Sequence, residues 1–129
     1  MKLFIASDLH GEMGPHGYDV PVGLDLDIAV FAGDIGRGPP LSTGCSVEQA
    51  LRDRPVLFVA GNHEYYRTVL QDAAAEIRDR ARGTKVMFLD ADVVPVIDGV
   101  RFVGFTLWTD YMFRGRRLLT AAPHLQSRA

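Results

Sequence analysis

The chain has 129 residues, of which 47% are hydrophobic and 23% are charged, and its formal net charge is −2. This length and composition fit a single domain with a hydrophobic core, and the weakly acidic balance excludes the broad basic field that gathers nucleic acid. No apolar run approaches the roughly 20 residues that span a membrane, and the single cysteine, Cys45, excludes an internal disulfide and predicts a reducing, cytoplasmic setting.

Three apolar runs predict the first strands of the fold. Residues 3–6 form a short run, while residues 28–32 and 56–60 are continuous apolar runs typical of strands buried on both faces. Residues 11–24 and 36–44 are rich in Gly and Pro, which predicts a loop after each of the first two strands. The pattern therefore indicates buried strands that are joined by surface loops.

Two helices are predicted in the same part of the chain. Ser46 is placed to cap a short helix over residues 47–52, because its hydroxyl accepts an otherwise unpaired amide hydrogen. Residues 68–82 contain strong helix formers, with Glu76 and Arg80 at helical spacing. Gly83 follows this segment, where a glycine commonly ends a helix.

The next runs predict a change from strand–helix units to an antiparallel hairpin. Residues 86–89, 93–97 and 100–106 have the composition of strands. Asp98-Gly99 lies between the last two and predicts a tight turn. This order of elements indicates an α/β protein with a mixed sheet or two packed sheets.

A polar motif follows each of the first three predicted strands. The motifs are Asp8-Leu9-His10, Gly33-Asp34 and Gly61-Asn62-His63-Glu64. The first two motifs alone each fit an ordinary strand-end turn, in which Asp and Gly are common. The third is more specific, because Asn and His directly after a buried strand both need polar partners and are hard to explain by packing. Ligands of α/β sheets collect outside the carboxyl ends of strands, so the three motifs together predict one site. Carboxylates, imidazoles and an amide oxygen are ligands for hard or borderline divalent metals.

The three motifs resemble the opening motifs of the calcineurin-like metallophosphoesterases, which read D-x-H, G-D and G-N-H-[DE]. The resemblance covers residues 1–110. It implies an α/β fold in which a mixed β-sheet sandwich is flanked by helices. It also implies a metal-dependent hydrolase, either a phosphatase or a phosphodiesterase, that acts on a small phosphoester substrate with two divalent metal ions.

The same resemblance implies a role for each motif residue. Asp8 and His10 would bind the first ion, Asp34 would bridge both ions and Asn62 would bind the second. His63 would lie near the scissile phosphate, as the proton donor to the leaving oxygen or as a stabiliser of developing charge. Mixed oxygen and nitrogen ligands are compatible with Mn²⁺, Fe, Zn²⁺ or Mg²⁺.

The chain departs from the family pattern after the three opening motifs. The family continues with a later histidine and a G-H-x-H motif, but His124 has no preceding Gly and no histidine two residues on, so no role is assigned to it. Residues 114–129 carry basic but no acidic side chains. We therefore expect a partial phosphoesterase domain over residues 1–113, truncated at its C-terminus, and a basic tail over residues 114–129. A change of reading frame or an early stop would explain this tail, and so would a short tail native to the protein.

Two other functions are compatible with this departure. One is a catalytically inactive half-site that binds at most one metal ion, because the later ligands are missing. The other is an interaction module, in which open sheet edges associate and form a homo-oligomer. Metal stoichiometry separates the first alternative from the hydrolase, and the size of the particle in solution tests the second.

Overall fold

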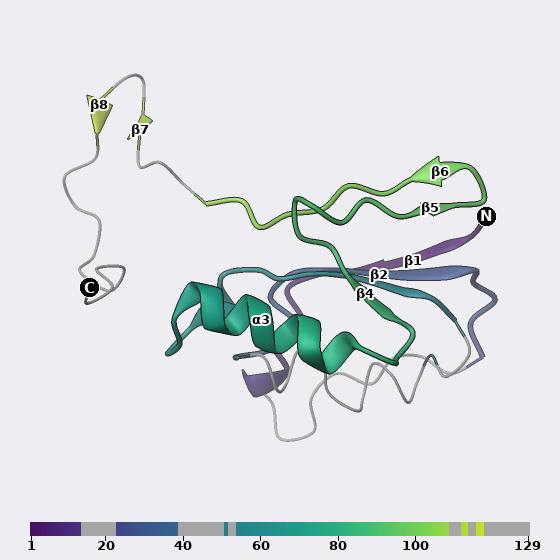
Figure 1. Ribbon diagram of the computed structural model, residues 1–129, viewed down its shortest axis with the longest axis horizontal. Helices are drawn as coiled ribbons and strands as arrows, with labels where there is room; N and C mark the ends of the chain where they lie inside the picture. The colour runs from purple at the N-terminus through teal and green to yellow at the C-terminus, as the bar shows by residue number, and fades with distance from the viewer. Residues whose placement is uncertain (14–22, 39–50, 52–53, 109–111, 114–115, 118–129) are drawn as a thin grey trace.

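The computed structural model describes residues 1–13, 23–38, 51, 54–108, 112–113 and 116–117 of the chain. These residues form a central sheet with a helix on one side and a hairpin on the other (Figure 1). The predicted helix over residues 47–52, with its Ser46 cap, lies outside the described residues except for Leu51, and most of the basic tail also lies outside them.

Four parallel strands make the central sheet. In spatial order they are β1 (Leu3–Ala6), β2 (Ile28–Ala32), β3 (Val56–Val59) and β4 (Val86–Phe88). Parallel strands cannot be joined by tight turns, so each connection must cross back over the sheet. The parallel order therefore brings all four carboxyl ends to the same edge, at the left of the sheet in Figure 1.

The register makes the first three strands end nearly level with one another. Ala6 lies opposite Phe31, and Ala32 lies opposite Val59. The motif that follows each strand therefore begins within a residue or two of the same line across the sheet. This alignment brings three segments that are far apart in the sequence into one place.

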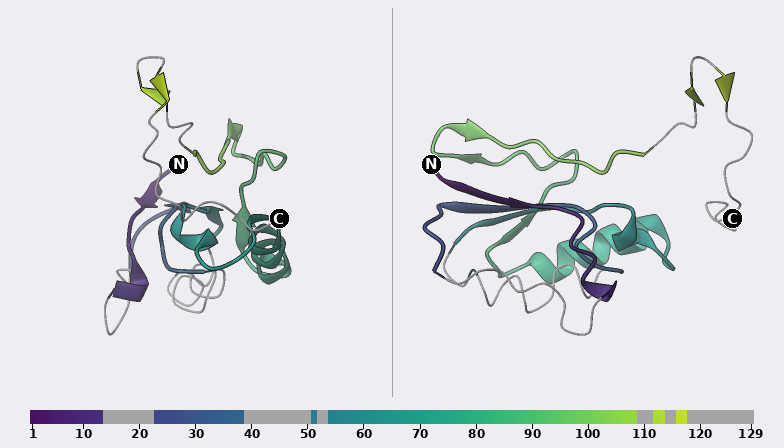
Figure 2. Two further views of the ribbon diagram at one scale, coloured as in Figure 1. Left: turned by 90° about the vertical axis from the view of Figure 1, so that its left-hand side faces the viewer. Right: turned by 180° about the vertical axis from the view of Figure 1, so that it is seen from behind.

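Helix α3 (Leu70–Ala81) covers one face of the sheet, as the two further views also show (Figure 2). Ile77 on this helix is fully buried and belongs to one apolar cluster with Phe31 and Phe58 of the sheet. Burial of such side chains contributes about 1.5–3 kcal/mol each to folding, which makes this face the main core. Gly83 follows the helix at φ +74°, the left-handed conformation in which glycine ends helices.

Helix α3 confirms the helix predicted over residues 68–82, with slightly shorter bounds. The predicted pairing on its surface is also present, because Arg80 lies 2.8 Å from Glu76 one helical turn earlier. No described helix combines the length and the apolar character needed to cross a membrane.

A hairpin covers part of the opposite face of the sheet. It consists of β5 (Val96–Ile97) and β6 (Val100–Arg101), which pair antiparallel. The turn residues Asp98 and Gly99 have φ values of +49° and +77°, as the tight turn with two left-handed residues requires. The Asp-Gly signal in the sequence therefore predicted this hairpin correctly.

The hairpin strands are shorter than the runs at 93–97 and 100–106 predicted. Pro95 has no amide hydrogen, although its carbonyl oxygen still accepts a hydrogen bond from the amide of Phe102. Beyond β6, Gly104 lies so close to the sheet that a Cβ atom there would be 2.6 Å from a methyl carbon of Val59. In the described part of the chain, this segment contacts the sheet face and pairs with no further strand.

The expectation that every strand is buried is wrong for β1. Leu3 and Ile5 on this strand are 42% and 64% exposed, and Ala32 at the end of β2 is also exposed. β1 is an edge strand. The hairpin packs on the same face of the sheet but away from β1, where Ile97 and Phe102 contact the cluster that contains Leu57. The half of the face that includes β1 therefore has no cover among the described residues.

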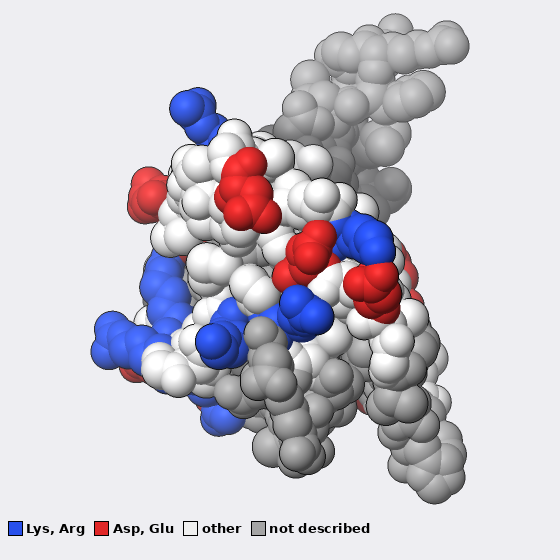
Figure 3. Space-filling view, turned by 90° about the vertical axis from the view of Figure 1, so that its right-hand side faces the viewer, with Lys and Arg blue, Asp and Glu red and all other residues white. Residues whose placement is uncertain are grey.

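The last described residues form a small ladder between β7 (Met112–Phe113) and β8 (Arg116–Arg117). The division of the chain into a domain that ends at residue 113 and a tail stays a prediction. At the amino-terminal ends of the strands, acidic and basic side chains alternate over the surface (Figure 3). The ion pair between Lys2 and Asp25 lies at this end, and such mixed charge does not build a basic field.

Candidate metal centre

Three loops meet at the carboxyl edge of the sheet and are tied together through their backbones. The amide of Asp8 donates to the carbonyl of Gly33 at 3.0 Å, and the amide of His10 donates to the carbonyl of Asp34 at 3.0 Å. The amide of Gly11 continues the pattern with the carbonyl of Ile35 at 2.8 Å. The loops after β1 and β2 therefore stay side by side beyond the point where the sheet ends.

All three predicted ligands from these two loops have left-handed backbones. The φ values are +54° for Asp8, +45° for His10 and +53° for Asp34. The backbone across Asp8-Leu9-His10 therefore differs from the extended backbone of the preceding strand β1. Non-glycine residues in this conformation cost free energy and concentrate at functional sites, where the surrounding structure holds them in place.

The side chains of Asp8, His10 and Asp34 converge despite this difference. One ligand atom of each lies within 4.8 Å of the corresponding atoms of the other two. Asp34 is also fixed from the third loop, because its Oδ1 accepts a hydrogen bond of 2.9 Å from the amide of His63. A Cβ atom at Gly61 would lie 2.2 Å from the same Oδ1, so only glycine allows this approach.

Glu64 links the second loop to the third through hydrogen bonds. Its side chain is fully buried, and its two carboxylate oxygens accept four backbone hydrogen bonds of 2.7–3.1 Å. The donors are the amides of Asp34, Ile35, Gly36 and Gly61. A carboxylate with four donors is fully satisfied and has no capacity left for a metal ion. The last residue of the third motif therefore has a structural role here.

Asn62 and His63 lie at the start of the short helix η2 (His63–Tyr65). The side-chain nitrogen of Asn62 donates to the hydroxyl of Tyr66 at 2.8 Å, so the carbonyl oxygen is the atom of this side chain that can ligate a cation. The ring of His63 contacts two other rings, with its centroid 4.3 Å from that of His10 and 4.5 Å from that of Tyr66. His10 and His63 thus face each other across the predicted site.

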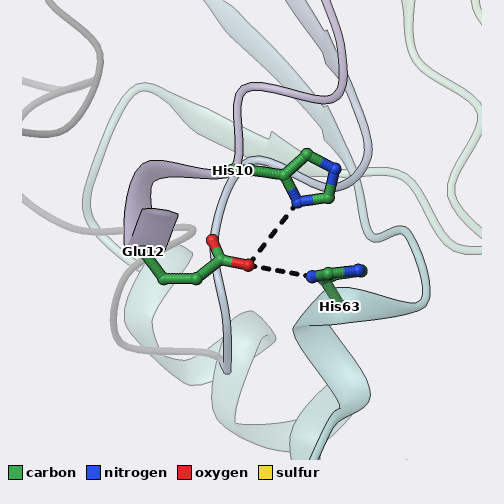
Figure 4. Close-up of side chains that lie close together, drawn as sticks. All are labelled: His10, Glu12 and His63. Carbon is green, nitrogen blue, oxygen red and sulfur yellow. Dashed lines mark hydrogen bonds and ion pairs between the residues drawn. The ribbon is translucent and has the colours of Figure 1, made fainter. Parts of the chain in front are cut away.

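Glu12 is a site residue that the sequence reasoning missed. It belongs to the short helix η1 (Gly11–Met13), and its Oε1 lies 2.9 Å from Nδ1 of His63 and 3.5 Å from Nδ1 of His10 (Figure 4). Burial acts to raise the pKa of Glu12, but its own backbone amide, the hydrogen bond from His63 and the nearby ring of His10 outweigh this and lower the pKa. Its position two residues after His10 was the only sequence signal for this contact.

The arrangement fits a divalent cation. Two buried side-chain atoms, Nδ1 of His10 and Oε2 of Glu12, have no hydrogen-bond partner within the described part of the chain. Besides the group formed by Asp8, His10 and Asp34, a second group of ligand atoms within 4.8 Å is formed by His10, Glu12 and His63. Oxygen and imidazole donors of this kind suit Mn²⁺, Fe, Zn²⁺ and similar ions.

The comparisons with known proteins agree with this geometry. The family model described as calcineurin-like phosphoesterase matches residues 1–114. The curated proteins and the solved structures contain no match to this chain. The matched range includes all three motifs and the whole central sheet.

Proposed function

Because the chain belongs to the calcineurin-like phosphoesterase family, we propose that it hydrolyses a small phosphoester with the help of two divalent metal ions. The observation that carries this proposal is the convergence of Asp8, His10 and Asp34 within 4.8 Å at the strand ends. The left-handed backbone of all three residues supports it, because such strain persists where function requires it.

The ligand roles follow the positions of the residues. We propose that Asp8 and His10 hold the first ion, that Asp34 bridges both ions and that the carbonyl oxygen of Asn62 holds the second. Divalent cations in such a site neutralise the phosphoryl oxygens and activate a water molecule for in-line attack. The chain itself contributes the rigidity of the site, because backbone hydrogen bonds and the buried Glu64 fix the loops against one another.

We propose that His63 acts on the leaving group. Its ring stands beside His10, at a centroid distance of 4.3 Å, and its backbone amide is held by Asp34. A histidine in this place donates a proton to the leaving oxygen or stabilises its developing charge. The substrate is a phosphomonoester or a phosphodiester, and we place the reaction in the cytoplasm because the single cysteine suits a reducing compartment.

Calorimetric titration of the metal-free chain with Mn²⁺, followed by assays on phosphoesters, tests this function. We expect two ions per chain and Mn²⁺-dependent turnover that Asp34→Asn abolishes. Asp98→Asn is the matched control, since Asp98 lies in the hairpin turn and asparagine tolerates its left-handed backbone. One weakly bound ion without turnover would instead identify an inactive half-site, and unchanged turnover by Asp34→Asn would contradict the proposed ligands.

We propose self-association as a second candidate function. The uncovered half of the sheet face exposes Leu3 and Ile5, and the segment after β6 exposes Val103, Phe105 and Leu107 at 62%, 51% and 81%. Exposed apolar groups of this kind mark interaction surfaces, and an edge strand can pair with another chain. Light scattering should give the mass of a homo-oligomer, and Ile5→Lys should reduce it to that of a monomer. A monomeric wild-type chain would exclude this function.

A further inference from the structure

Glu12 lies beside two imidazole rings and has no part in the roles proposed above. Its side chain is only 9% exposed, and the backbone turn that carries it is closed by a 2.7 Å hydrogen bond from the amide of Met13 to the carbonyl of His10. Figure 4 shows the carboxylate of Glu12 directed at the rings of His10 and His63, which come from different loops. A buried carboxylate at this position requires an explanation in terms of its contacts.

The closest of these contacts is to His63. Oε1 of Glu12 lies 2.9 Å from Nδ1 of His63, whereas its distance to Nδ1 of His10 is 3.5 Å. A carboxylate accepts hydrogen bonds, so the 2.9 Å contact requires the hydrogen of the His63 ring to be on Nδ1. The other ring nitrogen, Nε2, lies on the side away from Glu12 (Figure 4).

The remaining contacts of His63 leave its ring little freedom. The ring contacts those of His10 and Tyr66, and the backbone amide donates to Asp34. Ring contacts restrain the plane of an imidazole, but they do not choose between the two orientations that exchange Nδ1 with Cδ2 and Nε2 with Cε1. The hydrogen bond to Glu12 makes that choice, as a carboxylate partner does for histidines in many catalytic sites.

We infer that Glu12 is a positioning residue, which holds the ring of His63 with Nε2 available to the leaving oxygen of a phosphoester. The inference rests on the function proposed for His63. In the reaction, the oxygen of a water molecule forms the new bond to phosphorus while the bond to the leaving oxygen breaks. The His63 ring donates in its doubly protonated form, with one hydrogen on Nδ1 toward Glu12 and one on Nε2. The leaving oxygen keeps the electron pair and takes the proton from Nε2, which leaves the neutral ring with its hydrogen on Nδ1. The proton lost by the water restores the doubly protonated ring. Glu12 keeps its charge and exchanges no proton.

The ring of His63 can be observed directly by nuclear magnetic resonance of the nitrogen atoms in the metal-free chain. At about pH 9, well above the usual histidine pKa, we expect the neutral ring to carry its hydrogen on Nδ1. Glu12→Ala removes the acceptor, so the two tautomers should mix. Glu12→Gln keeps an acceptor oxygen and should restore the Nδ1 form. Glu76→Ala is the matched control, because Glu76 is on the surface of α3 and pairs with Arg80.

The kinetic test compares two phosphoesters that differ in the leaving group. An alkyl ester needs a proton on its leaving oxygen, whereas a nitrophenyl ester does not. We expect Glu12→Ala to lower kcat for the alkyl ester by about 10–100-fold with little change in KM, and to have a much smaller effect on the nitrophenyl ester. In a His63→Asn background, Glu12→Ala should have no further effect on either ester.

The competing role for Glu12 is that of a metal ligand, since His10, Glu12 and His63 also form a group of ligand atoms within 4.8 Å. Calorimetry with Mn²⁺ separates the two roles, because a positioning residue leaves metal affinity unchanged in Glu12→Ala. Lower affinity, equal losses on both esters or an unchanged tautomer would each overturn the inference. If the tautomer depends on Glu12 but the chain turns over no ester, the positioning contact stands and the proposed hydrolase function fails.

Discussion

At the scale of single residues, the site depends on carboxylates that accept hydrogen bonds from the protein's own backbone amides. Glu64 accepts four hydrogen bonds from backbone amides, and Asp34 accepts one from the amide of His63. Amides that are buried without a partner cost about 1–3 kcal/mol each, so these carboxylates stabilise a loop geometry that the bare backbone would not keep. The left-handed φ of Asp34 is an example of the strain that they offset.

Replacing Glu64 with glutamine should therefore be costly despite the similar shape. The glutamine side chain offers one acceptor oxygen and turns an NH2 group toward two amides that formerly donated. We expect Glu64→Gln to lower the free energy of unfolding by about 2–6 kcal/mol in urea titrations. Glu76→Gln on the surface of α3 serves as the control and should change it by less than about 0.5 kcal/mol. Equal stability of the two variants would show that the buried carboxylate does not hold the loops.

The stability that the Tyr65 phenol contributes should fall at alkaline pH. Burial raises the pKa of its phenol above the usual 10, and the charges of Asp90 and Glu64 act in the same direction. The hydroxyl of Thr106 donates its hydrogen to the carbonyl of Ala60 at 2.6 Å, so Tyr65 must be the donor in its 3.3 Å contact with Thr106. Ionisation of Tyr65 removes that donor.

The sign of the effect on stability follows from the raised pKa. The contribution of the Tyr65 phenol is complete below the unfolded pKa of about 10 and is lost as pH rises through the higher folded value. The phenolate absorbance of the wild type minus that of Tyr65→Phe should give a titration above that of a free tyrosine. Above that pH, Tyr65→Phe should lose less stability than the wild type. A difference titration at or below the usual value would contradict this account.

The elements of the fold differ in how far the sequence alone predicts them. The strand ends and their motifs are local signals, because an apolar run and the polar residues after it are contiguous in the chain. The length of β5 and β6 is not local, since it depends on whether a neighbouring strand exists to pair with. The contact between Glu12 and His63 is equally non-local, because 51 positions separate the two residues in the sequence.

Helix α3 offers a test of one local signal. Gly83 follows the helix at φ +74°, and a Cβ atom there would meet no other atom within 4 Å. The cost of Gly83→Ala is therefore purely conformational, and we expect a loss of about 1 kcal/mol in the free energy of unfolding. Gly83→Asn should cost less, because asparagine tolerates the left-handed region. If both variants lost the same amount, side-chain size rather than backbone conformation would explain the loss.

At the scale of the whole molecule, the proposed metal ions join segments that are distant in the sequence. Asp8, Asp34 and Asn62 follow three different strands, and the parallel order of the sheet brings these strand ends to one edge. Without a cation, the carboxylates of Asp8 and Asp34 lie close together and repel each other. Metal binding should therefore stabilise the complete sheet and not only the loops.

We expect Mn²⁺ to raise the melting temperature of the chain. An ion that binds only the folded state adds about 2.7 kcal/mol at 100 times its Kd, which corresponds to roughly 10 °C for a chain of this size. Asp34→Asn should abolish the shift and yet leave the metal-free protein at least as stable, because asparagine still accepts the hydrogen bond from His63 and removes the repulsion with Asp8. Melting curves with and without Mn²⁺ measure both effects. A full shift in Asp34→Asn would place the ion elsewhere, and a less stable metal-free variant would show that Asp34 is needed mainly for folding.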